Sequence, residues 1–191
     1  MLGGVARNCG YRAPGVVGKA LSLRLTGGQA RGRVLREPVP PGVRPTSSRV
    51  REALFAMIGH DLTGVRMLDA FGGSGLVAIE AWSRGAAVTV VEKDPAIARS
   101  LRRRAAEVEA QLTIRVGDVL ESNEESFDGI FVDPPYAMGA QPAEVLAARA
   151  ESWLVLECTR DLREPPIIGE LQLDRRKDYG GSSLVVYRRS A

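Results

Sequence analysis

The sequence predicts an α/β fold: a doubly wound, mostly parallel sheet of seven strands, preceded by a basic N-terminal arm that contains a β-hairpin. Short apolar runs alternate with helical stretches from Val65 onward, and such repeated strand–helix units indicate a parallel sheet with right-handed crossovers. Residues 1–51 hold ten Arg and Lys but one acid, whereas residues 52–191 hold sixteen basic and twenty-two acidic residues. This segregation of charge predicts that the arm contacts a polyanion such as nucleic acid.

The chain divides into three predicted segments. Residues 1–19 form a mobile basic tail, residues 20–45 a hairpin and linker, and residues 46–191 the main domain. Apolar residues alternate over residues 21–25, as in a half-buried strand, and residues 31–35 can return as its hairpin partner across a Gly-rich turn.

Helices and strands follow the linker in a regular order. Thr46, Ser47 or Ser48 can cap the first helix. The Ala-rich stretch 137–152 leaves open whether a helix precedes the fifth strand, and Tyr179-Gly180-Gly181 predicts a hairpin turn between the last two strands. Helices are expected at residues 49–58, 74–84 and 95–110, and strands at residues 65–70, 87–91, 112–116, 129–132, 153–156, 170–173 and 184–187.

Composition excludes several classes of protein. The 191 residues suit one domain, and no stretch approaches the roughly 20 apolar residues that a membrane span needs. Two cysteines, Cys9 and Cys158, cannot form a disulfide framework, and they lack the spacing of a zinc site. With His60 as the one histidine, Ser-His-Asp catalysis and multi-histidine metal sites are not expected. We therefore expect a cytoplasmic protein without a metal, and nothing in the sequence requires a dimer.

Four successive predicted strands end in an acid: Asp69, Glu92, Asp118 and Asp133. Ligands of open parallel sheets bind beyond the carboxyl ends of the strands, so these side chains should gather at one site. A single acid after a strand is commonly a helix cap. Four in consecutive strands favour a binding site.

The first of these acids opens a glycine-rich loop, Asp69-Ala70-Phe71-Gly72-Gly73-Ser74-Gly75, at the start of a helix. Glycines let a ligand approach the backbone, and a helix N-terminus offers free N–H groups to an anion. The loop also fits the dinucleotide fingerprint, with Glu92 nineteen residues after Gly73 as the ribose-binding acid. A nicotinamide dehydrogenase therefore remains an alternative.

Charge favours S-adenosylmethionine (SAM) over a dinucleotide in this loop. Asp69 would repel a pyrophosphate, whereas it attracts the ammonium and sulfonium groups of SAM. Glu92 can accept two hydrogen bonds from the ribose diol, and Asp118 one from the adenine amino group, beside the N–H of Val119. The candidate cofactor-binding residues are Asp69, Phe71, Gly72, Gly73, Ser74, Gly75, Glu92, Lys93, Asp118 and Val119.

Asp133-Pro134-Pro135-Tyr136 is the most specific motif. The prolines lack N–H groups and have a fixed φ, so this corner presents carbonyl acceptors in a rigid turn. An amino group on a flat ring can donate to the Asp133 carboxylate and the Pro134 carbonyl, which aims its lone pair at a methyl donor, and Asp133 can accept the departing proton. Tyr136 can stack on the ring. Asp133, Pro134 and Tyr136 are the candidate catalytic residues.

Taken together, four segments resemble a known family: residues 27–33 (GGQARGR), residues 44–55 (RPTSSRVREALF), the glycine loop at 69–75 and the corner at 133–136. They are similar to the bacterial small-subunit (16S) ribosomal RNA guanine-N2 methyltransferases, which are Rossmann-like class I SAM-dependent enzymes. The resemblance implies methyl transfer to the N2 of a guanine in ribosomal RNA, with residues 20–45 binding RNA and residues 46–191 forming the methyltransferase domain. It also implies that Thr46 approaches the methionine end of SAM, and that Arg31, Arg33, Arg44, Arg49 and Arg51 contact RNA.

Three alternatives stay open from the sequence. Adenine N6 in DNA or RNA suits the same Asp-Pro-Pro-Tyr corner. A non-catalytic RNA-binding module would bind RNA without methyl transfer, and a nicotinamide dehydrogenase would bind a dinucleotide with no need for a basic arm. The target nucleotide, and whether free RNA or an assembled particle is the substrate, do not follow from the sequence.

Overall fold

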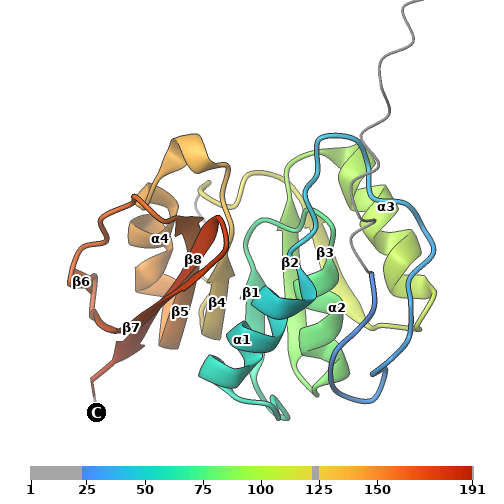
Figure 1. Ribbon diagram of the computed structural model, residues 1–191, viewed down its shortest axis with the longest axis horizontal. Helices are drawn as coiled ribbons and strands as arrows, with labels where there is room; N and C mark the ends of the chain where they lie inside the picture. The colour runs from blue at the N-terminus through green and yellow to red at the C-terminus, as the bar shows by residue number, and fades with distance from the viewer. Residues whose placement is uncertain (1–22, 122–124, 191) are drawn as a thin grey trace, which may run out of the picture.

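The computed structural model describes residues 23–121 and 125–190, which form one eight-stranded sheet (Figure 1). The predicted tail, residues 1–19, lies outside the described residues. The order of strands across the sheet is β3-β2-β1-β4-β5-β8-β7-β6. Their bounds are β1 Arg66–Asp69, β2 Ala87–Glu92, β3 Leu112–Val116, β4 Phe127–Val132, β5 Ala150–Thr159, β6 Ile167–Ile168, β7 Leu171–Tyr179 and β8 Ser182–Arg189.

The α/β class and the parallel part of the sheet are confirmed. The first five strands are parallel, while β8 lies antiparallel between β5 and β7. The predicted number of seven strands is wrong, because Ile167–Ile168 adds an eighth at the edge, and two residues after a pair of prolines give no strand pattern in the sequence. The turn after Tyr179 joins β7 to β8 as predicted, with Gly180 at a φ of 60°.

Helices cover both faces of the sheet (Figure 1). On one face, α1 (Ser48–Ile58), α2 (Leu76–Ser83) and α3 (Pro95–Ala106) bury apolar side chains against the strands. The other face packs against α4 (Gln141–Leu146), and short 3-10 turns at Tyr136–Met138 and Ala147–Arg149 flank this helix. A helix therefore does precede the fifth strand, within the stretch 137–152. None of the helices in the described parts of the chain has the length and apolarity of a membrane span.

The N-terminal arm is packed onto the domain. The predicted hairpin is reduced to a single antiparallel bridge between Arg24 and Val34. Leu25 and Leu35 are buried against α2 and α3, and the backbone N–H of Gln29 donates to the carbonyl of Ser83 at 2.7 Å. The 27–33 turn therefore lies at the C-terminal end of α2.

Candidate functional site

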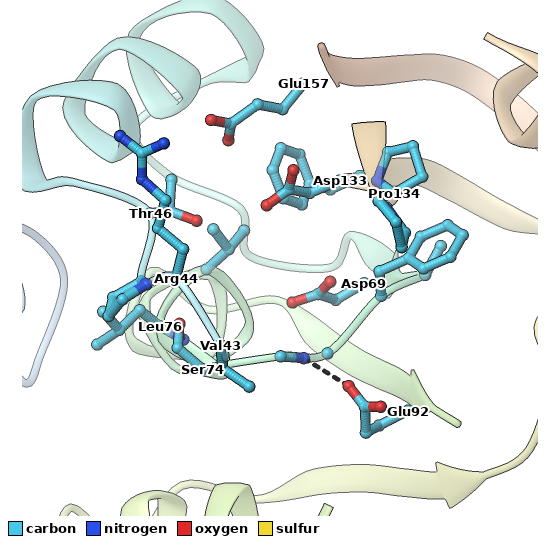
Figure 2. Close-up of a pocket in the computed structure, with 18 of the residues that line it drawn as sticks. Val43, Arg44, Thr46, Asp69, Ser74, Leu76, Glu92, Asp133, Pro134 and Glu157 are labelled. Carbon is cyan, nitrogen blue, oxygen red and sulfur yellow. Dashed lines mark hydrogen bonds between the residues drawn. The ribbon is translucent and has the colours of Figure 1, made fainter. Parts of the chain in front are cut away.

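A cavity of about 850 Å³ lies at the carboxyl ends of the parallel strands (Figure 2). All four predicted strand-end acids line it: Asp69 and Glu92 are the last residues of β1 and β2, and Asp118 and Asp133 follow β3 and β4. The site is therefore positioned by the sheet, because neighbouring parallel strands end at the same edge.

Asp69 is a buried carboxylate with one unsatisfied oxygen. Its side chain is at the floor of the cavity in Figure 2, the residue is 2% exposed, and its Oδ1 has no hydrogen-bond partner. Burial raises the pKa of Asp69 well above its usual range, the charges of Asp133 and Glu92 add to this, and backbone hydrogen bonds from Phe71 and Ala78 oppose it. A buried acceptor without a partner favours a ligand that brings a donor or a cation.

The glycine loop that follows is held by Glu92. The Gly73 N–H donates to Oε2 of Glu92 at 2.8 Å, and the Asp94 N–H donates to Oε1 at 2.8 Å. Gly73 has a φ of 50°, in the left-handed region that favours glycine. Gly75 does not line the cavity: a Cβ there would lie 2.5 Å from Leu101, so its role is to let α2 and α3 pack closely.

The Asp118 end of the cavity carries an ion pair. Lys93 Nζ lies 2.9 Å from Asp118 Oδ2, and the Leu120 N–H donates to Oδ1 at 3.0 Å. The hydrogen bond from Lys93 lowers the pKa of Asp118, with a further contribution from Leu120. Val119 is buried beside them, and Lys93, Asp118 and Val119 all line the cavity.

The opposite end of the cavity holds the proline corner and a second carboxylate. Asp133, Pro134 and Tyr136 line it as predicted, and Glu157 joins them from the end of β5. Burial raises the pKa of Asp133 well above its usual range, and the charge of Glu157 raises it further. Tyr136 is 51% exposed, so its ring is free to receive a planar group.

The linker before α1 closes the cavity from the side. Figure 2 shows Val43, Arg44 and Thr46 facing the strand-end carboxylates across the cavity. The charge of Arg44 lowers the pKa of both Asp133 and Glu157, although burial dominates each shift. The cavity lining also includes Thr46, Phe71, Gly72 and Ser74.

Three of the five predicted RNA-binding arginines are exposed outside the cavity, and Arg44 is exposed while lining it. Arg49 is on the first turn of α1, close to the cavity wall. Arg31 and Arg33 are on the 27–33 turn, at the far end of α2 from the glycine loop, and Arg33 donates to the Glu107 carbonyl at 2.7 Å. The structure therefore does not bring these two to the cavity.

The prediction that Arg51 contacts RNA is wrong. Arg51 is fully buried, and its Nε lies 3.0 Å from Oε2 of the equally buried Glu80. The physical reason is helix periodicity: Arg51, Leu54 and Phe55 are spaced i, i+3, i+4 and share the buried face of α1.

Several residues of the cavity lining were not among the predicted site residues, and these include the polar residues Glu157 and Ser182. Glu157 directly follows the predicted strand at 153–156, so the strand-end rule that located the other acids could have found it. Ser182 comes from the antiparallel β8, whose place beside β5 no local pattern reveals. Within the described residues, no three His, Cys, Asp or Glu side chains are grouped as metal ligands.

Comparisons with known proteins identify the family of this chain. The family model described as Conserved hypothetical protein 95 matches residues 23–188. The chain is 33% identical over 186 residues to the Ribosomal RNA small subunit methyltransferase D of Escherichia coli K12, covering 88% of this chain and 91% of that protein.

Solved structures show the same fold. The Escherichia coli yhhF protein superposes with a TM-score of 0.77 at 31% identity, covering 89% of this chain and 99% of its own. A hypothetical protein of Thermus thermophilus gives a TM-score of 0.72 at 32% identity, with coverage of 85% and 97%. The chain therefore belongs to the Conserved hypothetical protein 95 family of methyltransferases, together with the ribosomal RNA small subunit methyltransferase D proteins.

Proposed function

We propose that this protein transfers a methyl group from SAM to the exocyclic N2 of a guanine in small-subunit ribosomal RNA. The observation that carries the proposal is that the Asp69 carboxylate, with its unsatisfied oxygen, and the Asp133–Pro134 corner line the same cavity. The name of the Escherichia coli relative, at 33% identity, supports ribosomal RNA as the substrate.

The residues present fit SAM. The unpartnered Oδ1 of Asp69 suits its ammonium group, because a buried carboxylate gains most from a charged donor. Glu92 is already fixed by two backbone N–H groups and keeps acceptor capacity for the ribose diol. When bound, SAM supplies a methyl group on a positively charged sulfur.

The chain's own residues orient the acceptor base. Asp133 and the Pro134 carbonyl accept the two hydrogens of the exocyclic amino group, which directs its lone pair away from the ring. Tyr136 stacks on the base, and unstacking the base from the RNA costs a few kcal/mol. Asp133 then takes the proton that leaves the nitrogen. The methyl group passes directly from the sulfur of SAM to this nitrogen, and no covalent enzyme intermediate forms.

Product identity is the direct test of this function. Small-subunit RNA from cells lacking the protein, incubated with the enzyme and methyl-labelled SAM, should yield N2-methylguanosine after digestion to nucleosides. N6-methyladenosine would instead support the adenine alternative. Binding of RNA without any labelled nucleoside would support a non-catalytic module.

Asp69→Asn should weaken SAM binding about 10- to 100-fold, since a hydrogen bond to a charged group contributes about 1.5–3 kcal/mol. Isothermal calorimetry measures this, with NAD titrated in parallel as the dinucleotide alternative. Asp174→Asn, an exposed acid on β7 outside the cavity, is the matched control and should bind SAM as wild type does. Unchanged SAM affinity in Asp69→Asn would remove Asp69 from the cofactor site.

Arg49→Ala and Arg31→Ala should each weaken RNA binding and lower the slope of log affinity against log salt by about 0.7–0.9. RNA that contacts both must extend along α2, which is about 12 Å long. Arg66→Ala is the control, because Arg66 is exposed but its guanidinium is already paired with Asp128 and Glu151. Filter binding over a salt series gives the slopes, and a slope equal to wild type excludes a phosphate contact for that arginine.

A further inference from the structure

Glu157 is a buried carboxylate that the reaction above does not use. It is 8% exposed, it lines the cavity, and its Oε2 has no hydrogen-bond partner. Figure 2 shows its carboxylate directed into the cavity near Asp133 and opposite Arg44. A buried acceptor of this kind is costly unless a ligand brings a donor to it.

The sheet places Glu157 beside the catalytic corner. Val132 of β4 pairs with Leu156 of β5, so Asp133 and Glu157 are the next pair along two parallel strands. Side chains alternate along a strand, and both therefore project to the face on which α1 and α2 pack. Two carboxylates side by side present acceptors to one edge of a ligand.

Glu157 belongs to the base-binding end of the cavity. Its charge acts on Asp133 and on Tyr136, the residue proposed to stack on the base. The carboxylates that act on Asp69, at the cofactor end, are Asp133 and Glu92. Asp133 thus lies between the two ends, with Glu157 on the side of the base.

Guanine carries the edge that two adjacent acceptors fit. Its N1–H lies next to the 2-amino group, so the two groups form a row of donors. In adenine the amino group lies next to N1, which is an acceptor and would face a carboxylate lone pair to lone pair. Building on the proposed function, we infer that Glu157 selects guanine over adenine by accepting the guanine N1–H, while Asp133 and the Pro134 carbonyl hold the 2-amino group.

The test uses base analogues at the methylated position. Once the target nucleotide is mapped with wild-type enzyme, RNAs are assembled with guanine, 2-aminopurine or adenine at that position. 2-Aminopurine keeps the 2-amino group but lacks the N1–H, so wild type should methylate it about 100-fold less efficiently than guanine. Wild type that methylates both equally well overturns the inference without any variant.

Glu157→Gln should reverse this preference in part. The glutamine amide can donate to the unprotonated N1 of 2-aminopurine. The variant lacks, however, the charged carboxylate that accepts the N1–H of guanine. We expect kcat/KM on guanine to fall about 100-fold, with 2-aminopurine unchanged or improved, so that the two differ by less than about tenfold. Glu144→Gln, an exposed residue on α4, is the matched control and should keep the wild-type ratio.

The outcomes separate the two proposals. SAM affinity and thermal unfolding of Glu157→Gln verify that the variant is folded. A wild-type ratio in that variant overturns the role of Glu157 while leaving guanine-N2 methylation intact. Wild-type enzyme that forms no N2-methylguanosine overturns the proposed function, and the inference with it.

Discussion

Asp133→Asn is expected to reduce methyl transfer about 1000-fold, since a positioned proton acceptor contributes about 10²- to 10⁴-fold. The asparagine keeps the size of the side chain but removes its charge and its capacity to take the proton from the amino group. Single-turnover methylation with saturating SAM measures the loss. SAM affinity should change little, because the proposed function assigns Asp133 to the base and assigns Asp69 and Glu92 to the cofactor.

Asp128→Asn is the matched control for this experiment. Asp128 is on the same strand, β4, at the end away from the cavity, where it bonds the backbone N–H of Arg66 at 2.7 Å. It should retain full turnover. Wild-type turnover in Asp133→Asn as well would remove Asp133 from the mechanism.

The pH profile adds a second signature of Asp133. Burial, with the neighbouring charge of Glu157, raises the pKa of Asp133, and its carboxylate must be ionised to accept the proton. Wild-type turnover should therefore fall as the pH decreases through this raised pKa, above the usual range of an aspartate. The Asn variant loses the titration of Asp133, so the part of that limb due to Asp133 should disappear from its residual rate, whereas Glu157, whose pKa is also raised by burial, still titrates.

The strand ends show how far sequence reasoning could locate the site. Asp69, Glu92, Asp118 and Asp133 were found because each follows an apolar run, and the sheet topology brings such positions together. Glu157 also directly follows a predicted strand, so the same rule applies to it, although in the structure its strand continues to Thr159. The strand-end rule is therefore only as accurate as the strand ends that the apolar pattern predicts.

The arginines show where such reasoning fails. Arg49 and Arg51 are two residues apart in one basic helix, yet one is exposed and the other is fully buried. Arg51 is on the buried face of α1, and its charge is paired there with Glu80, a residue of α2 whose position relative to α1 depends on tertiary packing. Charge composition predicted contact with a polyanion for both arginines. Composition cannot show that a buried acid such as Glu80 pairs with one of them inside the domain.

Glu80 is the centre of a buried polar network that joins the arm, α1 and α2. Arg51 and Arg84 both pair with its carboxylate, at 3.0 and 2.9 Å, and the Thr26 N–H donates to it at 3.1 Å. Arg51 also donates to the carbonyls of Thr46 and Arg24, each at 2.5 Å. One guanidinium thus connects the cavity wall at Thr46 to the N-terminal arm.

Arg51→Met should destabilise the protein by about 3–5 kcal/mol, because removing one partner of a buried ion pair leaves the other charge uncompensated. For a domain of this size, that corresponds to a fall in Tm of roughly 6–20 °C in thermal unfolding. Arg49→Met, two residues away and exposed, should change stability by less than about 0.5 kcal/mol. Equal stability of the two variants would contradict a structural role for Arg51.

Acid pH should reduce the difference between Arg51→Met and wild type. Burial alone would raise the pKa of Glu80, but the hydrogen bonds from Thr26, Arg84 and Arg51 outweigh it and lower that pKa. The stability from a carboxylate with a lowered pKa is present above its unfolded-state pKa and is lost as the pH falls through the folded value. Once Glu80 is protonated, Arg51 has no anion to pair with, so wild type loses the advantage that the variant never had. The difference in stability between Arg51→Met and wild type could instead stay constant as the pH falls below the folded-state pKa of Glu80. The effect of Arg51 would then come from its packing and its two carbonyl contacts and not from the ion pair.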